Sequence, residues 1–361
     1  NDLITNFEEL ETAISQSNGT LILNSDVTKD SSEFDKYKDG IVINKNITII
    51  GNGFTINANN DGRIFFLNSG FTLTLINITL ANAHVSLDGG NDVRQGGAIY
   101  TDGGNIIISN SRFSNNSVDL DGKGYGGAIY VSNGNLNITD SQFVNNKGRQ
   151  GGAISLDDST AWISNTLFSE NIGNNHAAAI NSDHSDLTVL NSTFSFGKTG
   201  MSDGAGIYVT YGNLFVEATK FLNNTALSYG GAIYNSRANS IIKNCIFDGN
   251  YAAQDGGAVY NYYGNIDIIN SIFSHNTGYY YGGVIYTYNG IINIKDSTFS
   301  DNIGFWGGVI YNTITKMTIS NSSFYNNKAM WDENMASVIV NTGNLTIEDS
   351  IFENNTADTN G

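Results

Sequence analysis

Apolar and polar residues alternate along most of this chain in short runs, and the whole pattern returns about every 26 residues. Residues 256–276 show the unit: a Gly-Gly-Ala-Val-Tyr run, a short turn, an alternating segment at 265–269, and a Phe-x-x-Asn element that ends at Asn276. The residues equivalent to its phenylalanine, Phe273, are Phe113, Phe143, Phe168, Phe194, Phe221, Phe247, Phe299, Phe324 and Phe352. Ten copies at one period predict a solenoid, because a single copy cannot bury its own apolar face and must stack on its neighbours.

The copies are predicted to consist of β-strands, since they are rich in Gly, Asn and β-branched residues. Apolar residues alternate in Ile266-Asp267-Ile268, as in a strand with one buried face. One inward column is expected to contain Ile106, Leu136, Leu187, Leu214, Ile266, Ile292, Met317 and Leu345. A second is expected to contain Ile108, Ile138, Ile163, Val189, Val216, Ile242, Ile268, Ile294, Ile319 and Ile347.

Similar residues at the same phase indicate parallel strands that pair in register, about 4.8 Å apart from coil to coil. Connections between parallel strands are almost always right-handed. The sequence therefore predicts an all-β fold, a right-handed parallel β-helix.

Two polar columns accompany the apolar ones. Two residues before each phenylalanine lies a small residue, and these are Ser111, Ser141, Thr166, Ser192, Thr219, Cys245, Ser271, Ser297, Ser322 and Ser350. Three residues after it lie Asn116, Asn146, Asn171, Asn224, Asn250, Asn276, Asn302, Asn327 and Asn355, with Gly197 as the exception. Asn tolerates left-handed backbone conformations, and its amide can bond a turn and the next Asn, so we expect an internal ladder at a corner of the coil. In the serine column, Cys245 is expected to be buried and inert.

The single period favours one domain over residues 1–361. Its expected parts are an N-terminal cap (1–18), irregular first coils (19–95), ten regular repeats (96–355) and a truncated tail (356–361). Within the first coils, the charged stretch 29–39 is predicted to be a loop. The last copy ends without a capping helix, and we expect the native chain to continue beyond it.

The cap is predicted to be a short amphipathic helix. Phe7, Leu10 and Ile14 fall at helical spacing, and Asn6 and Glu9 have the spacing of a capping box. Such a helix would cover the core at the first coil and block edge-to-edge association.

From about Gly96 to Asn355, Gly-Gly-Ala-Ile elements alternate with Phe-x-x-Asn elements. This pairing resembles the repeat of chlamydial-type polymorphic outer-membrane proteins. The Asn-rich, proline-free composition is similar to that of adhesin-like surface proteins of methanogenic archaea, which carry the same repeats. The resemblance implies a surface-displayed adhesin and supplies no catalytic residues. The glycine element departs from its motif at 177–180, 204–207 and 336–339.

Composition narrows the class of partner. The chain has 17 basic and 34 acidic side chains, a net charge of −17, 53 asparagines and no proline. The charge disfavours nucleic acid and favours partners that are cationic or bridged by metal. Since no apolar run has membrane-spanning length, a membrane would be reached only through an anchor region outside this sequence. Ten Asn-x-Ser/Thr sequons fit an extracellular glycoprotein, and we expect a monomer.

Aromatic residues give the first candidate site. Fifteen of the 19 tyrosines lie between Tyr208 and Tyr325. A regular outward column is expected at Tyr208, Tyr234, Tyr260, Tyr286 and Tyr311, where a stacking ladder and a binding surface are both open interpretations. The binding residues predicted in loops and turns are Tyr229, Tyr251, Tyr262, Tyr263, Tyr279, Tyr280, Tyr281, Tyr288, Phe305, Trp306 and Trp331. Exposed tyrosine and tryptophan offer large contact areas to sugar rings or proteins at low entropic cost.

Acidic turns give two weaker candidates. Asp88, Asp92, Asp119 and Asp121 lie in glycine-bent loops of consecutive coils, where oxygen ligands could hold calcium, although solvated aspartates are the simpler interpretation. Asp157, Asp158 and Asp183, with His184 and Asp186 nearby, come from turns of adjacent coils, as carboxylate pairs do in β-helical glycan hydrolases. Chance stacking of acidic turns is the simpler interpretation of this second group.

The sequence thus favours an extracellular, cell-surface-attached adhesin without enzymatic activity, which recognises a glycan or protein on a partner cell. The main alternative is a polysaccharide lyase or glycoside hydrolase on the same fold. A second alternative is a structural stalk.

Overall fold

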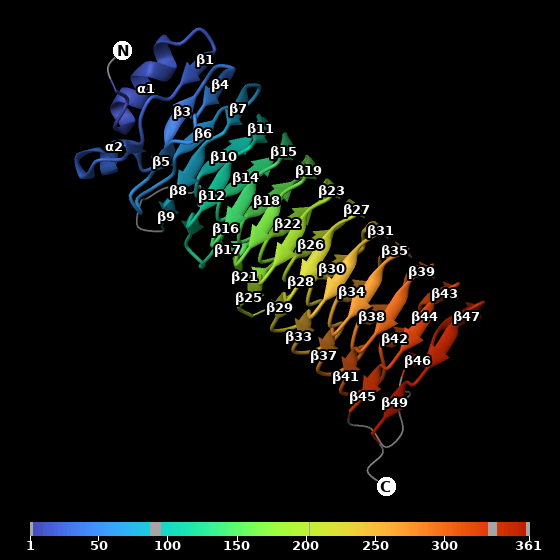
Figure 1. The fold of residues 1–361 in the computed structure, drawn as a ribbon. Helices are drawn as coiled ribbons and strands as arrows, with labels where there is room; N and C mark the ends of the chain where they lie inside the picture. Colours follow the sequence, from blue (N-terminus) through green and yellow to red (C-terminus); the bar gives the residue numbers. More distant parts are fainter. Residues whose placement is uncertain (1–2, 87–94, 202, 331–337, 359–361) are drawn as a thin grey trace. The chain divides into compact units, whose positions relative to one another are not determined.

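Figure 1 shows the fold in a computed structural model, which describes residues 3–86, 95–201, 203–330 and 338–358. The chain forms two compact units: residues 1–174 with 178–185, and residues 175–177 with 186–361. Each unit is a right-handed parallel β-helix, so the predicted fold is confirmed. The single-domain organisation of the chain stays a prediction.

Each regular coil of both units contributes one strand to each of four parallel sheets. We label these sheets C, A, B and D, in the order in which the chain passes through them. In the first unit, sheet A contains β1 (Thr20–Ile22), β4 (Ile47–Ile50), β7 (Thr72–Ile76), β11 (Asn105–Ser109), β15 (Asn135–Thr139) and β19 (Thr160–Ser164). Sheet B contains β2 (Val27–Thr28), β5 (Thr55–Asn57), β8 (Thr79–Ala81), β12 (Arg112–Ser114), β16 (Gln142–Val144) and β20 (Leu167–Ser169). Sheet C contains β3 (Ile41–Ile43), β6 (Phe65–Leu67), β10 (Ile99–Asp102), β14 (Ile129–Ser132), β18 (Ile154–Asp157) and β22 (Ile180–Asp183). Sheet D contains β9 (His84–Val85), β13 (Ser117–Val118), β17 (Lys147–Gln150) and β21 (Ile172–His176), the last of which ends in the second unit.

The second unit repeats the same coil. Its sheet A contains β23 (Asp186–Leu190), β27 (Asn213–Glu217), β31 (Asn239–Lys243), β35 (Asn265–Ile269), β39 (Ile291–Lys295), β43 (Lys316–Ser320) and β47 (Asn344–Glu348). Sheet B contains β24 (Thr193–Ser195), β28 (Lys220–Leu222), β32 (Ile246–Asp248), β36 (Ile272–Ser274), β40 (Thr298–Ser300), β44 (Ser323–Tyr325) and β48 (Ile351–Glu353). Sheet C contains β26 (Ile207–Thr210), β30 (Ile233–Ser236), β34 (Val259–Tyr262), β38 (Ile285–Tyr288), β42 (Ile310–Thr313) and β46 (Ile339–Asn341). Sheet D contains β25 (Lys198–Thr199), β29 (Thr225–Ala226), β33 (Tyr251–Ala252), β37 (Thr277–Gly278), β41 (Ile303–Gly304), β45 (Lys328–Ala329) and β49 (Thr356–Ala357).

The predicted register is confirmed. Ile266 and Ile268 of β35 pair with Ile292 and Ile294 of β39, and all four side chains are buried. In sheet B, Phe273 lies 4.7 Å from the next phenylalanine ring along the column, with nearly parallel ring planes. Stacked apolar columns on the inner faces of the sheets therefore form the core of each coil.

The corner before each sheet C strand requires a left-handed backbone conformation. At Gly256 φ is +66°, a value that glycine adopts without strain. Where the motif departs, the conformation persists, since φ is +47° at Ala177 and +62° at Gly204. Residues 336–337 of the third departure lie outside the described residues.

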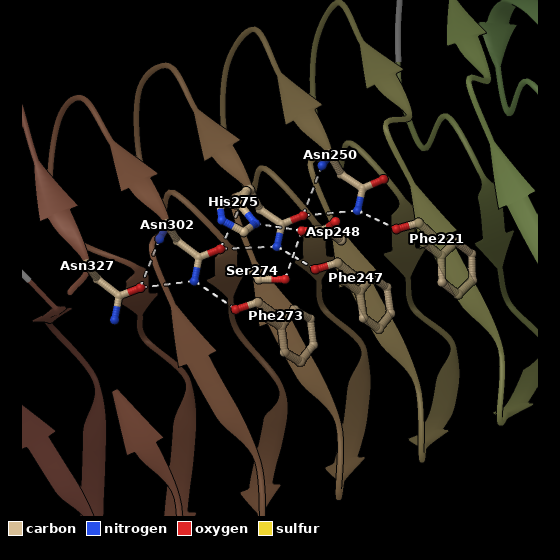
Figure 2. A network of polar contacts seen from close by, with 10 residues as sticks. Phe221, Phe247, Asp248, Asn250, Phe273, Ser274, His275, Asn302 and Asn327 are labelled. Carbon is tan, nitrogen blue, oxygen red and sulfur yellow. Dashed lines mark hydrogen bonds and ion pairs between the residues drawn. The ribbon is translucent and has the colours of Figure 1, made fainter. Parts of the chain in front are cut away.

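The asparagine column forms the predicted internal ladder (Figure 2). Both the backbone N–H and the side-chain amide of Asn250 donate to Oδ1 of Asn276, at 3.0 and 2.9 Å, and Asn276 donates in the same way to Asn302. Most of these amides also donate to the carbonyl of a phenylalanine in an earlier coil, as Asn250 does to Phe221 at 2.9 Å, whereas Asn116 donates to the Leu80 carbonyl. The left-handed residue at this corner precedes the ladder asparagine, with φ of +52° at His275, so the ladder residues themselves are not the ones that need that conformation.

In the serine column, Cys245 is buried, as predicted. The backbone N–H of Cys245 donates to the Ser271 hydroxyl at 3.1 Å, and its thiol contacts the carbonyl oxygen of Lys243 at 3.2 Å. Burial raises the pKa of the Cys245 thiol to about 11, so little reactive thiolate forms near neutral pH.

We expect Cys245→Ser to change the free energy of unfolding by less than about 1 kcal/mol, because the hydroxyl can bond the same carbonyl. Chemical denaturation of both proteins measures this difference. A thiol reagent should label native Cys245 far more slowly than the unfolded chain, and equal labelling rates would contradict its burial.

At the N-terminus, α1 (Phe7–Gln16) is the predicted cap helix. Oδ1 of Asn6 accepts the Glu9 N–H at 2.9 Å, and the buried side chains are Phe7, Leu10 and Ile14. The helix packs against β2, the first strand of sheet B in the first unit. Among the described residues, no helix is both long and apolar enough to cross a membrane.

The prediction of a loop at 29–39 is wrong. The segment forms a 3-10 turn, η1 (Ser31–Glu33), and a short helix, α2 (Phe34–Tyr37). Lys29 is fully buried: its Nζ donates to the Tyr37 carbonyl at 3.1 Å and pairs with Asp61 at 3.4 Å. Charged side chains usually indicate a surface position, and this burial is tolerable because the tertiary structure supplies backbone carbonyls and the Asp61 carboxylate to the ammonium group.

Candidate functional site

The outer face of sheet C in the second unit contains the tyrosines. Within β34, Val259 and Asn261 point inward, so Tyr260 and Tyr262 point outward. The regular column stacks ring on ring at centroid distances between 4.8 and 5.6 Å through Tyr208, Tyr234, Tyr260, Tyr286 and Tyr311. Burial raises the pKa of Tyr286 to about 12, which keeps its phenol neutral. These contacts favour the stacking interpretation of the column.

Ten of the predicted binding residues are described, and Trp331 lies outside the described residues. They fall into two groups at opposite ends of the sheet C strands. The group before the strands contains Tyr229, Tyr251, Tyr279, Tyr280, Tyr281, Phe305 and Trp306, and the group at the ends of the strands contains Tyr262, Tyr263 and Tyr288.

Four residues of the first group form a cluster on two successive coils, which we call the aromatic loop surface: Tyr279, Tyr280 and Trp306, which are exposed, and Phe305, which is half-buried. Tyr279 stacks on Phe305 at 4.9 Å and meets Tyr280 edge-on at 5.3 Å. The ring of Tyr280 lies 6.4 Å from that of Trp306, and the Trp306 N–H donates to the Tyr280 carbonyl at 2.9 Å. Backbone pairing between the loops thus holds the rings side by side while Trp306 stays 40% exposed.

Tyr229 and Tyr281 have a different environment. Tyr229 packs 4.6 Å from Tyr260, and Tyr281 packs 4.6 Å from Tyr311, so both rest on the stacked column. Between them in sequence, Asp255 accepts the Tyr281 N–H at 2.9 Å. Burial raises the pKa of the Asp255 carboxyl to about 6. These half-buried contacts give Tyr229 and Tyr281 a structural role in addition to any role in binding.

At the other end of the strands, sequence reasoning missed a cation. The Arg237 guanidinium lies over the rings of Tyr262 and Tyr263, at 5.5 and 5.6 Å from their centroids. Tyr288 stacks on Tyr262 at 5.7 Å. Arg237 and Tyr263 occupy the same corner of consecutive coils, both with positive φ, so the period itself could have revealed this contact.

The first unit brings the predicted catalytic carboxylates together. Asp157 ends β18 directly beside Asp183 of β22, and the Tyr130 hydroxyl lies 3.4 Å from Oδ2 of Asp157. Burial, followed by the charge of Asp183, raises the pKa of the Asp157 carboxyl. His184 pairs with Asp183 at 2.8 Å, and Asp158 occupies the adjacent corner at φ +45°. The pair could supply a general acid and a carboxylate base.

The predicted calcium loops are described only in part. Asp88 and Asp92 lie outside the described residues. Asp119 lies 3.6 Å from the His84 imidazole, and Asp121 is exposed. Within the described ranges, no group of three or more Asp, Glu, His or Cys side chains is arranged to hold a metal ion. Calcium therefore stays a prediction.

Comparison with known proteins identifies two repeat types. Residues 205–360 match the family model of a right-handed β-helix region. Residues 110–132 match the Chlamydia polymorphic membrane protein repeat. The solved structure of L. reuteri 53608 SRRP aligns over 99% of both chains at 15% identity, but its TM-score of 0.29 is too low to carry an argument. A search of curated proteins finds no significant match. The chain is thus similar to β-helix and polymorphic membrane protein repeats, which identifies a repeat scaffold.

Proposed function

We propose that this chain is a cell-surface adhesin whose aromatic loop surface binds a glycan or protein on a partner cell. The observation that carries the proposal is a cluster of four aromatic rings, three of them exposed and Phe305 half-buried, that the core does not require. Such rings offer contact area at low entropic cost. Similarity to a polymorphic membrane protein repeat supports display of this chain at a cell surface. The resemblance of its composition to that of adhesin-like proteins of methanogens is part of the same proposal.

The test replaces Tyr280 and Trp306 together by alanine and measures retention of the purified protein on a panel of microbial and host cells. We expect retention to fall at least tenfold on the cells that bind the original protein. Because both rings are exposed, the denaturation midpoint should stay the same.

Phe196→Ala is the matched control, since Phe196 is an aromatic residue of the second unit that is 52% exposed and lies outside the aromatic loop surface. It should leave cell retention unchanged. Full retention by the Tyr280/Trp306 variant would exclude the aromatic loop surface as the adhesive site. A lowered denaturation midpoint would show instead that these rings support the fold.

Asp157 and Asp183 support a second candidate, cleavage of a glycan. Their in-register pairing and the raised pKa of Asp157 are features of acid–base catalysts. Release of new reducing ends or unsaturated sugars from a polysaccharide panel, abolished by Asp157→Asn and Asp183→Asn, would establish this activity.

A further inference from the structure

A groove runs across the outer face of sheet A in the second unit. It has a volume of about 420 Å³ and crosses five neighbouring strands, β23, β27, β31, β35 and β39. Two outward columns form its walls, and the backbone of the inward residues between them, such as Leu214 and Ile266, forms its floor. The groove belongs to neither the aromatic loop surface nor the carboxylate pair, and the sequence alone did not reveal it.

One wall is a row of amides and carboxylates. The Asn213 amide donates to Asp186 at 2.7 Å, and the Asn265 amide donates to Asn239 at 3.0 Å. Among the described residues of this row, no hydrogen bond joins the side chains of Asn213 and Asn239, although both line the groove. Donors and acceptors on that wall remain open to solvent and to a polar ligand.

The opposite wall includes apolar side chains. Phe215 and Ile241 project from the centres of β27 and β31, and Ile241 is exposed. Two residues farther along the same strands, Glu217 and Lys243 pair with each other at 2.9 Å. Thr188, Asp267 and Asn293 complete that wall, so an aromatic and an aliphatic side chain stand beside polar groups and face a row of amides.

The first unit has a groove at the same position of its coil. Its volume is about 470 Å³, and it crosses β7, β11, β15 and β19. Asn105 and Asn135, joined by a hydrogen bond of 2.8 Å, form the polar wall. Ile107 and Trp162, both exposed, contribute to the other wall. Grooves with the same layout but different side chains occur in both units. The groove is therefore a feature of the coil and not of the side chains in one coil alone.

We propose that sheet A of each unit binds a linear, uncharged polysaccharide that lies along the groove, across the strands. Amide side chains match the paired hydroxyls of a sugar, and an aromatic ring such as the exposed Trp162 or the half-buried Phe215 matches the apolar face of a pyranose. Of the described residues that line the grooves, none is basic, and those of the first unit's groove carry no charge at all. The lining therefore offers no cationic partner to the carboxylates of a polyuronate.

Strand spacing sets the length of the bound segment. Strands lie about 4.8 Å apart, which is close to the length of one hexose unit in a chain, so the five strands of the second unit match about four or five sugars. An extended peptide advances about 3.3 Å per residue and would drift out of phase with the coils. The occupant is therefore expected to present one sugar per coil.

The test is isothermal titration of the whole chain with cello-, manno- and laminari-oligosaccharides of two to eight units, and with polygalacturonate. We expect at least one neutral series to bind, with affinity rising to about five units and then levelling, and polygalacturonate to fail. Trp162→Ala combined with Phe215→Ala should weaken binding about tenfold, the effect of losing one aromatic contact worth about 1.4 kcal/mol at each groove.

Phe196→Ala is the matched control, because it removes an exposed aromatic ring that lines neither groove and lies outside the aromatic loop surface, and it should leave oligosaccharide affinity unchanged. The proposal is overturned if no neutral series binds, if polygalacturonate or an extended peptide binds instead, or if the Trp162/Phe215 variant binds as tightly as the original. Cell retention of the same variants is measured separately, so a failure of adhesion and a failure of this groove give different results.

Discussion

Ile268→Asp should destabilise the second unit by more than about 4 kcal/mol. Ile268 is fully buried on β35 and pairs in register with Ile242 of β31 and Ile294 of β39, which are also buried. A carboxylate at this position would enter an apolar column without a partner, and in a repeat array each coil is stabilised only by its neighbours. The denaturation midpoint and limited proteolysis would both detect the loss, with cleavage expected near the altered coil.

Ile272→Asp provides the matched control. Ile272 lies on β36, one strand farther along the same coil, and is 46% exposed, so its replacement should change stability by less than about 0.5 kcal/mol. If the two variants had the same denaturation midpoint as the original protein, the inward assignment of the Ile268 column would be wrong.

Asn276→Ala should cost about 3 kcal/mol or more, although it removes only a small side chain. Oδ1 of Asn276 accepts two hydrogen bonds from Asn250, and Nδ2 donates to Asn302 and to the Phe247 carbonyl. Alanine would leave both Asn250 donors buried without their acceptor, and each such group costs about 1–3 kcal/mol. Figure 2 shows these partners in successive coils.

Asn293→Ala is the control for this substitution. Asn293 is exposed on β39, where its amide makes one hydrogen bond of 2.7 Å to Asp267. Water can replace that bond, so the denaturation midpoint should fall far less than for Asn276→Ala. Similar midpoints for both variants would mean that the internal ladder contributes little to stability.

The coil could be predicted from the sequence because its contacts repeat. In a parallel, in-register solenoid the partner of a residue lies one period away, so Ile268 and Ile294 could be matched by counting. The same counting placed Asp157 beside Asp183. The period also specified the asparagine ladder, since equivalent amides at one corner can only meet each other. A second buried row was missed: Asn235, Asn261 and Thr287 bond one another inside sheet C, in a column that also contains the buried Val209 and Asn312.

Contacts between residues that are not one repeat apart could be found only in the tertiary structure. Lys29 is buried because a turn and a distant carbonyl converge on its ammonium group, and no local pattern encodes that convergence. The exposure of Trp306 and the packing of Tyr281 on Tyr311 depend on how two loops of similar sequence pack against sheet C. The sheet A grooves depend on the volumes of side chains in neighbouring columns. Repetition along the chain therefore determined which residues stack from coil to coil, whereas lateral packing within a coil decided which surfaces are left open to bind.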